Sequence, residues 1–184
     1  KASELGVPLD ADAPETKRIL AHAKELENEG YEFEGADASL ELLMRRAKGE
    51  GRTFFKLDGF HVTVIQQPSA PSAVSVATVL VTMPDGTSKH TVAEGNGPVD
   101  ALNSALRKAL EHTYPELRDM RLEDYKVRIL DARSATRATT RVLLGSCDLE
   151  DSWSTVGVSE NILSASYEAL ADSIAFKLMR TRGA

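Results

Sequence analysis

The sequence predicts an α+β fold in which a helical segment is followed by two βββα units that form a pseudo-symmetric domain. Three observations predict this fold. Apolar residues recur at helical spacing up to about residue 50 and then alternate with a period of two. The order of three strands and one helix occurs twice, at about 53–115 and 120–180. A glycine precedes each closing helix, and these glycines, Gly95 and Gly157, are about 62 residues apart, long enough for a supersecondary unit.

Residues 1–50 are expected to form a helical subdomain. Pro14 suits the first turn of a helix, Asp12 before it is a candidate cap, and Gly30 would end the helix. The apolar face of this helix consists of Ile19, Ala23 and Leu26. A second helix follows Asp37, and its apolar stripe consists of Leu40, Leu43, Met44 and Ala47. The segment is acidic and has few bulky apolar residues, so we do not expect it to fold alone.

The first βββα unit starts after Gly51, where the apolar period changes to two. Strands are predicted over 54–67, 74–83 and 87–94. Between the last two strands, Pro84-Asp85-Gly86 is a tight-turn sequence. The closing helix carries its apolar stripe on Val99, Leu102, Leu106 and Leu110.

The second unit repeats this order, with strands predicted over 122–131, 136–146 and 151–158. The first of these strands alternates cleanly and places on one side Tyr125, Val127 and Ile129. Ser159 is the predicted cap of the closing helix, whose apolar residues include Ile162, Leu163, Leu170 and Ile174. Both units together predict one domain over 51–184, in which helices pack on antiparallel sheets.

Composition argues against several classes of protein. The 184 residues carry a formal net charge of −6, which argues against nucleic-acid binding because phosphates attract a basic surface. The longest apolar-leaning run, 73–83, is far shorter than the roughly 20 residues of a membrane span. The single Cys147 allows no internal disulfide. The chain opens on Lys1 without a basic and then apolar leader, so we expect a piece of a longer cytoplasmic protein.

The sequence offers no catalytic or metal-binding constellation. None of the four histidines is paired at metal-ligand spacing, and Cys147 has no CxxC partner, so we expect no metal and no cofactor in this chain. Ser146 lies in a Gly-Ser-Cys sequence that lacks the second glycine of a nucleophile elbow. The glutamates between Glu25 and Glu34 are better explained as a solvated helix end than as a cation site. We therefore predict no catalytic residues.

The stretch from Gly95 to Asp100 is the best candidate for binding a small ligand. Glycines allow unusual backbone angles, and the free N–H groups at the start of a helix attract a carboxylate. The stretch lacks the Lys-Ser/Thr of a phosphate-binding loop, so a nucleotide is not indicated. A turn that needs glycine for its geometry alone explains the stretch equally well. For Tyr125, periodicity alone favours a place in the core over a place in a pocket.

Four stretches resemble the citramalate synthase and 2-isopropylmalate synthase family. Residues 26–34 (LENEGYEFE), followed by 36–39 (ADAS), resemble the helical linker of citramalate synthases. The glycine-rich turn of the family's regulatory domain is similar to 94–102 (EGNGPVDAL), and its next strand is similar to 122–130 (LEDYKVRIL). A Trp-x-Thr-Val-Gly sequence before the closing helix is similar to 153–162 (WSTVGVSENI). These stretches occur in the family's order and span nearly the whole chain.

The resemblance implies a helical linker (1–50) followed by a regulatory and dimerisation domain (51–184). The parent enzyme would be an acyltransferase that condenses acetyl-CoA with an α-keto acid, either pyruvate or 2-oxoisovalerate. Its catalytic barrel, with a divalent metal, is absent from this sequence, so we expect no turnover by the chain alone. The chain would form a homodimer and bind the pathway end product, isoleucine for a citramalate synthase or leucine for an isopropylmalate synthase.

The resemblance also assigns effector-binding residues, which we name by their numbers here. The turn would contribute Gly95, Asn96, Gly97, Val99 and Asp100. The strand would line an apolar pocket with Leu122, Tyr125 and Ile129. Backbone N–H groups would hold the effector's carboxylate, and Asp100 would pair with its ammonium group. The family's turn after this strand carries a glycine that 132–137 (ARSATR) lacks, so no contacts are assigned there.

Two other functions remain open. A purely structural dimerisation module would form the dimer but bind no effector. A free-standing enzyme would require a nucleophile or metal site, which the sequence does not offer.

Overall fold

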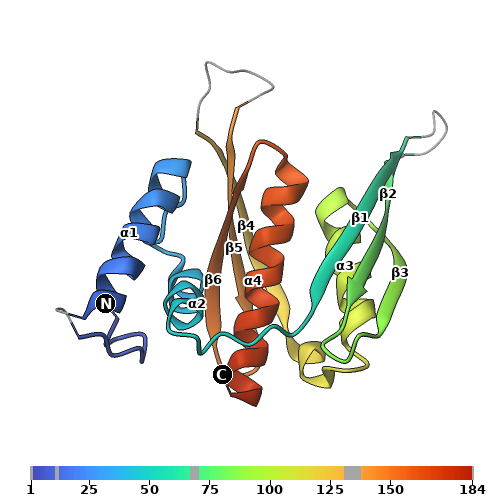
Figure 1. Ribbon diagram of the computed structural model, residues 1–184. Coiled ribbons are helices and arrows are strands. Elements are labelled where there is room, and N and C mark those ends of the chain that lie inside the picture. The colour runs from blue at the N-terminus through green and yellow to red at the C-terminus, as the bar shows by residue number, and fades with distance from the viewer. Residues whose placement is uncertain (1, 11–12, 67–70, 131–137, 184) are drawn as a thin grey trace. The chain divides into compact units, whose positions relative to one another are not determined.

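The computed structural model describes residues 2–10, 13–66, 71–130 and 138–183. Its contacts divide the chain into two compact units, residues 1–52 with 119–184 and residues 53–118. Asp12, the predicted cap of the first helix, and the turn 132–137 lie outside the described residues. Each unit contains one three-stranded antiparallel sheet and the helix that follows it, which confirms the predicted α+β fold with two βββα units (Figure 1).

The unit over 53–118 contains the first sheet, in the strand order β1-β2-β3. Its elements are β1 (Lys56–Ile65), β2 (Val74–Thr82), β3 (Ser88–Gly95) and α3 (Pro98–Leu110). Helix α3 packs on one face of this sheet, mainly on β2 and β3. The 3₁₀ helix η1 (Pro115–Asp119) follows, and the Tyr114 hydroxyl donates a buried hydrogen bond of 2.6 Å to the carbonyl oxygen of Phe54. The two ends of this unit are thereby tied together.

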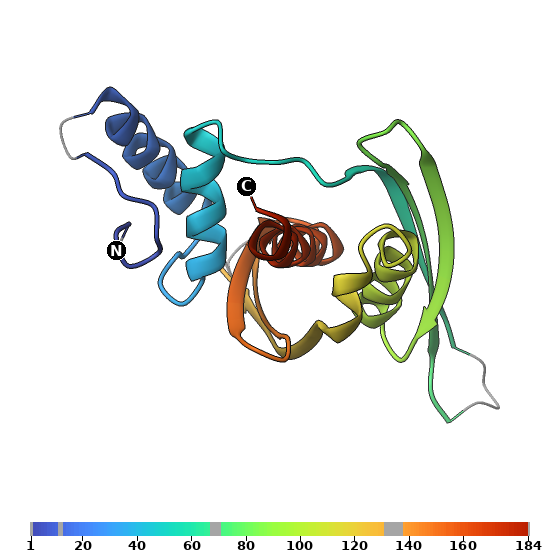
Figure 2. The same cartoon turned by 90° about the horizontal axis from the view of Figure 1, so that it is seen from below.

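The other unit contains the second sheet, in the order β4-β5-β6, and the two N-terminal helices. Its elements are α1 (Pro14–Glu29), α2 (Asp37–Ala47), β4 (Arg121–Ile129), β5 (Thr140–Cys147), β6 (Ser152–Ser159) and α4 (Ile162–Arg182). Helix α4 covers β5 and β6, and α2 contacts both β6 and α4 (Figures 1 and 2). Phe33 and Ala36, between α1 and α2, pack with Val156 of β6 in one apolar cluster. The helical segment is therefore packed against the sheet of this unit.

The two βββα units share details beyond their strand order. The Thr91 hydroxyl donates to the carbonyl oxygen of Ala105 at 2.7 Å, and Thr155 makes the same bond to Ala169 at 2.7 Å. The two threonine donors are 64 positions apart in the sequence, and so are the two alanine acceptors. A register shift interrupts β1 between Leu57 and Gly59, and an equivalent one interrupts β4 between Leu122 and Asp124, which are displaced by 65 positions. The units are thus equivalent residue by residue.

This equivalence corrects the predicted match between Gly95 and Gly157. These two glycines are 62 positions apart in the sequence, whereas equivalent residues of the two units are 64 or 65 positions apart. Gly95 corresponds instead to Ser159, at the end of its strand, while Gly157 lies inside β6. Each glycine is required by its own surroundings. A Cβ at Gly95 would lie 2.3 Å from the backbone N of Ala101, and a Cβ at Gly157 would lie 2.0 Å from the carbonyl oxygen of Ala165. In both cases the closing helix approaches its strand too closely for any side chain.

The cap of α4 also differs from the prediction. Asn161, rather than Ser159, is the N-cap, and its side-chain oxygen accepts the backbone N–H groups of Leu163 and Ser164 at 2.8 and 3.3 Å. The Ser159 hydroxyl accepts the N–H of Asn161 at 3.1 Å and so supports the turn before the helix.

Candidate functional site

The eight predicted effector residues fall into two groups, one in each unit. Gly95 to Asp100 form the turn between β3 and α3, and the strand group lies on β4. Within the turn, the backbone N–H of Asn96 donates to the Asp100 carboxylate at 2.9 Å, while Gly97 caps α3 and Val99 belongs to its first turn. The Asn96 N–H, expected to hold an effector carboxylate, therefore already has a partner within the turn.

A hollow of about 390 Å³ lies beside this turn. The carboxylates of Glu94 and Asp100 both line it, together with Ser72 and Asn96. Two carboxylates attract a positively charged group of a ligand and repel a carboxylate of that ligand. The turn is accordingly better suited to an ammonium group than to the carboxylate of an amino acid.

The strand group lies on the face of the second sheet that α4 covers. Leu122, Tyr125 and Ile129 stand opposite Ser146, Leu144 and Thr140 of β5, respectively, and all three of these neighbours are buried. Tyr125 nevertheless remains 39% exposed and Ile129 59% exposed. Placement on the helix-covered face agrees with a core position, whereas this exposure leaves both side chains accessible to a ligand.

The Tyr125 hydroxyl makes a hydrogen bond of 2.8 Å with Ser166 of α4. Ser166 donates its own hydrogen to the carbonyl oxygen of Ile162 at 2.6 Å, so Tyr125 is the donor of the first bond. In the other unit, the equivalent positions hold Phe60 and Leu102, which cannot form such a bond. One polar pair therefore distinguishes the helix side of β4 from its counterpart on β1. Sequence reasoning did not identify Ser166, because its partner lies 41 positions away in the chain.

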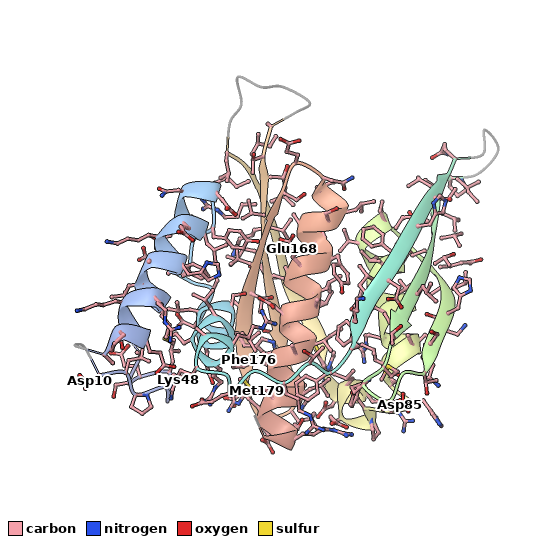
Figure 3. All side chains as sticks on the ribbon, in the orientation of Figure 1. Asp10, Lys48, Asp85, Glu168, Phe176 and Met179 are labelled. Carbon is pink, nitrogen blue, oxygen red and sulfur yellow. The ribbon has the colours of Figure 1, made fainter. Side chains whose placement is uncertain are left out.

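A cavity of about 520 Å³ lies between α1, α2, β6 and α4. Tyr31 donates to Glu168 of α4 at 3.0 Å, and Ser39 and Arg46 donate to Asp172 at 3.0 and 2.8 Å. Glu168, labelled in Figure 3, also accepts the N–H of Val158 at 3.1 Å. The polar groups of this cavity are thus engaged in holding the helical segment on α4.

The same contacts perturb two tyrosines. Burial raises the pKa of Tyr31, and the neighbouring Glu168 carboxylate raises it further. Burial, followed by the charges of Asp172 and Glu168, raises the pKa of Tyr167 to about 12. Both hydroxyls stay protonated at neutral pH, and that of Tyr31 donates its hydrogen to Glu168. The sequence contained one sign of this arrangement, because Glu168 and Asp172 lie one helical turn apart on α4. It did not identify the residues that contact them.

Within the described part of the chain, no group of three or more His, Cys, Asp or Glu residues could hold a metal ion. No helix over the same residues is long and apolar enough to cross a membrane. His61 makes a hydrogen bond of 2.9 Å with the Thr63 hydroxyl, and His22 lies 3.6 Å from the Glu25 carboxylate.

Comparison with known proteins identifies relatives of the whole chain. A family model described as the LeuA allosteric (dimerisation) domain matches residues 34–178. An (R)-citramalate synthase of Geobacter sulfurreducens is 51% identical over 181 residues, covering 98% of this chain and 34% of the relative. The (R)-citramalate synthase of Aquifex aeolicus is 46% identical over 180 residues, with 98% and 34% covered. That of Sulfolobus acidocaldarius is 34% identical over 175 residues, with 95% and 31% covered. The chain thus spans about a third of the length of these relatives.

Proposed function

The chain belongs to the LeuA allosteric (dimerisation) domain family, and from this premise we propose that it senses an amino acid for a citramalate synthase. In this proposal the chain forms a homodimer in the cytoplasm and binds isoleucine, the end product of the pathway. Binding lowers the activity of a catalytic barrel that condenses acetyl-CoA with pyruvate at a divalent metal. Residues 1–50 link that barrel to the regulatory domain over 51–184.

The observation that carries the proposal is the accessible apolar side of β4. Tyr125 and Ile129 stand beside buried neighbours, yet both expose more than a third of their surface. Burying the branched side chain of an amino acid there would contribute roughly 1.5–3 kcal/mol. The Tyr125–Ser166 pair adds one oriented polar group to this surface.

The eight predicted residues remain the proposed effector contacts. On β4, Leu122, Tyr125 and Ile129 would receive a branched side chain. In the other unit, the Asp100 carboxylate would attract an ammonium group. Glu94 joins this proposal because it lines the same hollow as Asp100. Isoleucine and leucine differ only in shape, so selectivity between them depends on how closely the apolar groups pack.

A thermal-shift titration with isoleucine, leucine and valine tests the proposal. An amino acid at about 100 times its Kd should stabilise the chain by roughly 2.7 kcal/mol. Tyr125→Ala should abolish this shift, whereas the matched control Phe60→Ala changes the equivalent residue of the other unit and should retain it. A shift with leucine alone would assign the parent to isopropylmalate synthesis. If no amino acid stabilises the chain, either the effector site requires the catalytic barrel or the chain is a purely structural dimerisation module.

A further inference from the structure

Ser166 is a buried polar residue in the apolar contact between α4 and its sheet. Its side chain is 1% exposed, and Ala169 and Leu170 on the same helix are fully buried. A hydroxyl in such surroundings requires hydrogen bonds, because burying it without a partner costs free energy. Ser166 has two partners, the carbonyl oxygen of Ile162 and the Tyr125 hydroxyl. It is therefore bonded both to its own helix and to β4.

The bond to Ser166 holds the Tyr125 side chain in one position. Tyr125 uses its one hydroxyl hydrogen in this bond, because Ser166 donates its own hydrogen to Ile162. The Tyr125 side chain therefore spans the space between β4 and α4, with its hydroxyl fixed at the α4 end. Rotation of the ring away from α4 would break the bond. Ser166 thus restrains a side chain that is 39% exposed to solvent.

Toward the C-terminal end of α4, the contact between helix and sheet is closed. Ser173 lies about two helical turns beyond Ser166, and both Ser173 and Ser146 of β5 are fully buried. The Ser173 hydroxyl donates to Ser146 at 2.6 Å and accepts the indole N–H of Trp153 at 2.8 Å. Ser173 is therefore a serine of the core, whose partners are themselves buried.

Toward the N-terminal end of α4, the apolar surface becomes accessible. The exposed fraction rises from 39% at Tyr125 to 59% at Ile129, and Ile162 in the first turn of α4 is 45% exposed. Thr140 of β5 stands opposite both Ile129 and Ser159, so Ile129 and the start of α4 lie at the same end of the sheet. The bond between Tyr125 and α4 thus marks the boundary between the closed core and the accessible surface.

We propose that Ser166 is a positioning residue for the effector. It holds the Tyr125 ring as the inner wall of the accessible surface and so sets which branched side chains that surface accepts. This inference rests on the proposed function, in which Tyr125 and Ile129 receive the side chain of an amino acid. A surface distinguishes apolar side chains of different shape only where its walls are fixed, because a wall that moves adapts to several shapes. In the unit over 53–118, Phe60 and Leu102 replace this pair and cannot form the bond, so we expect the selectivity to reside on β4.

Isothermal titration calorimetry with isoleucine, leucine and valine tests the proposal on Ser166→Ala. The Kd of the preferred amino acid should rise about fivefold, in line with the loss of one hydrogen bond. The ratios between the three Kd values should also move toward one, because the ring is no longer fixed.

Ser173→Ala is the matched control, because it removes a second buried serine hydroxyl from α4. It leaves the buried indole N–H of Trp153 without this acceptor, whereas water can reach the partly exposed Tyr125 in Ser166→Ala. Urea unfolding should therefore show the larger loss of stability for Ser173→Ala. Its three Kd values should nevertheless equal those of the unaltered chain, which a merely structural role of Ser166 would not predict.

Tyr125→Phe removes the same hydrogen bond from β4, and it covers the case in which Ser166→Ala does not fold. It keeps an aromatic ring, so it should raise the Kd and level the ratios as much as Ser166→Ala. The double variant should bind no more weakly than either single variant, because both changes act on one bond. Additive losses, or Kd ratios that neither single variant changes, would overturn the positioning role and leave the proposed function standing. No binding of any amino acid to the unaltered chain would contradict an effector site within this chain, and the role of Ser166 with it.

Discussion

Replacement of Lys177 by Met should destabilise the domain more at neutral pH than in acid. The Lys177 ammonium group is buried near the C-terminal end of α4, where it donates to the Asp148 carboxylate at 2.7 Å. It also lies 3.2 Å from an oxygen of Asp119. Asp148 in addition accepts the backbone N–H groups of Glu150 and Asp151, both at 2.8 Å. One cation thus connects α4 with the β5–β6 turn and with Asp119, which precedes β4.

The pKa of Asp148 gives the magnitude. Burial alone would raise this pKa, but the hydrogen bonds from Lys177 and from the two backbone N–H groups outweigh burial and lower it from 3.8 to about 2. A carboxyl whose pKa is lower in the folded state stabilises the fold above its unfolded pKa, and this stability is lost as the pH falls through the folded pKa. The difference corresponds to about 2 kcal/mol, of which about half is already lost at pH 3.

Lys177→Met removes the cation and leaves two carboxylates with no counter-charge at this site, so we expect a loss of about 3 kcal/mol at pH 7. Because Asp148 becomes protonated in acid, the difference between the variant and the unaltered chain should fall by about 1 kcal/mol at pH 3. Urea unfolding followed by circular dichroism at both pH values measures this difference. Lys126→Met, which removes an exposed lysine beside Asp124, is the control and should leave stability nearly unchanged, because exposed ion pairs contribute little. An equal loss for Lys177→Met at pH 7 and pH 3 would refute the assignment to Asp148.

Three further substitutions, one of them with a control substitution, test local features. Asn161→Ala removes the cap of α4 and should cost about 1 kcal/mol, measured by urea unfolding at neutral pH. Gly157→Ala would place a Cβ 2.0 Å from a carbonyl oxygen of α4 and should lower Tm strongly, whereas Gly59→Ala has open space around it and should cost at most about 1 kcal/mol. Glu168→Gln removes the charge that helps to raise the pKa of Tyr31, so an ultraviolet titration should find that tyrosine ionising at lower pH than in the unaltered chain.

Periodicity predicted the elements because each one is fixed by local chemistry. The change from helical spacing to alternation after Gly51 marks the place where α2 has ended and β1 is about to begin. The same reasoning paired Gly95 with Gly157 because it treated glycine as a marker of the repeat. The structure shows that each glycine makes room for its own helix, so the two need not be equivalent.

The candidate site was harder to predict, because its contacts join residues far apart in the chain. Periodicity placed Tyr125 on one side of a strand, but whether that side is covered depends on the position of α4. The Tyr125–Ser166 bond and the Tyr31–Glu168 bond span 41 and 137 positions, and no local pattern encodes either of them. The capping prediction at Ser159 was wrong by two positions because serine and asparagine are both suitable caps, and only the backbone shows which of them precedes the helix.

The helical segment protects the edge of β6, as a fourth strand would in a wider sheet. A chain shortened to residues 51–184 would lose Ser39, which satisfies the N–H of Val156, and Phe33, which covers its side chain. The shortened protein would then expose the edge of β6, and unprotected strand edges promote aggregation. Truncation at a point that separates helix from strand in the sequence would therefore cut through one folding unit, and deletion studies of this region would do better to retain the two N-terminal helices.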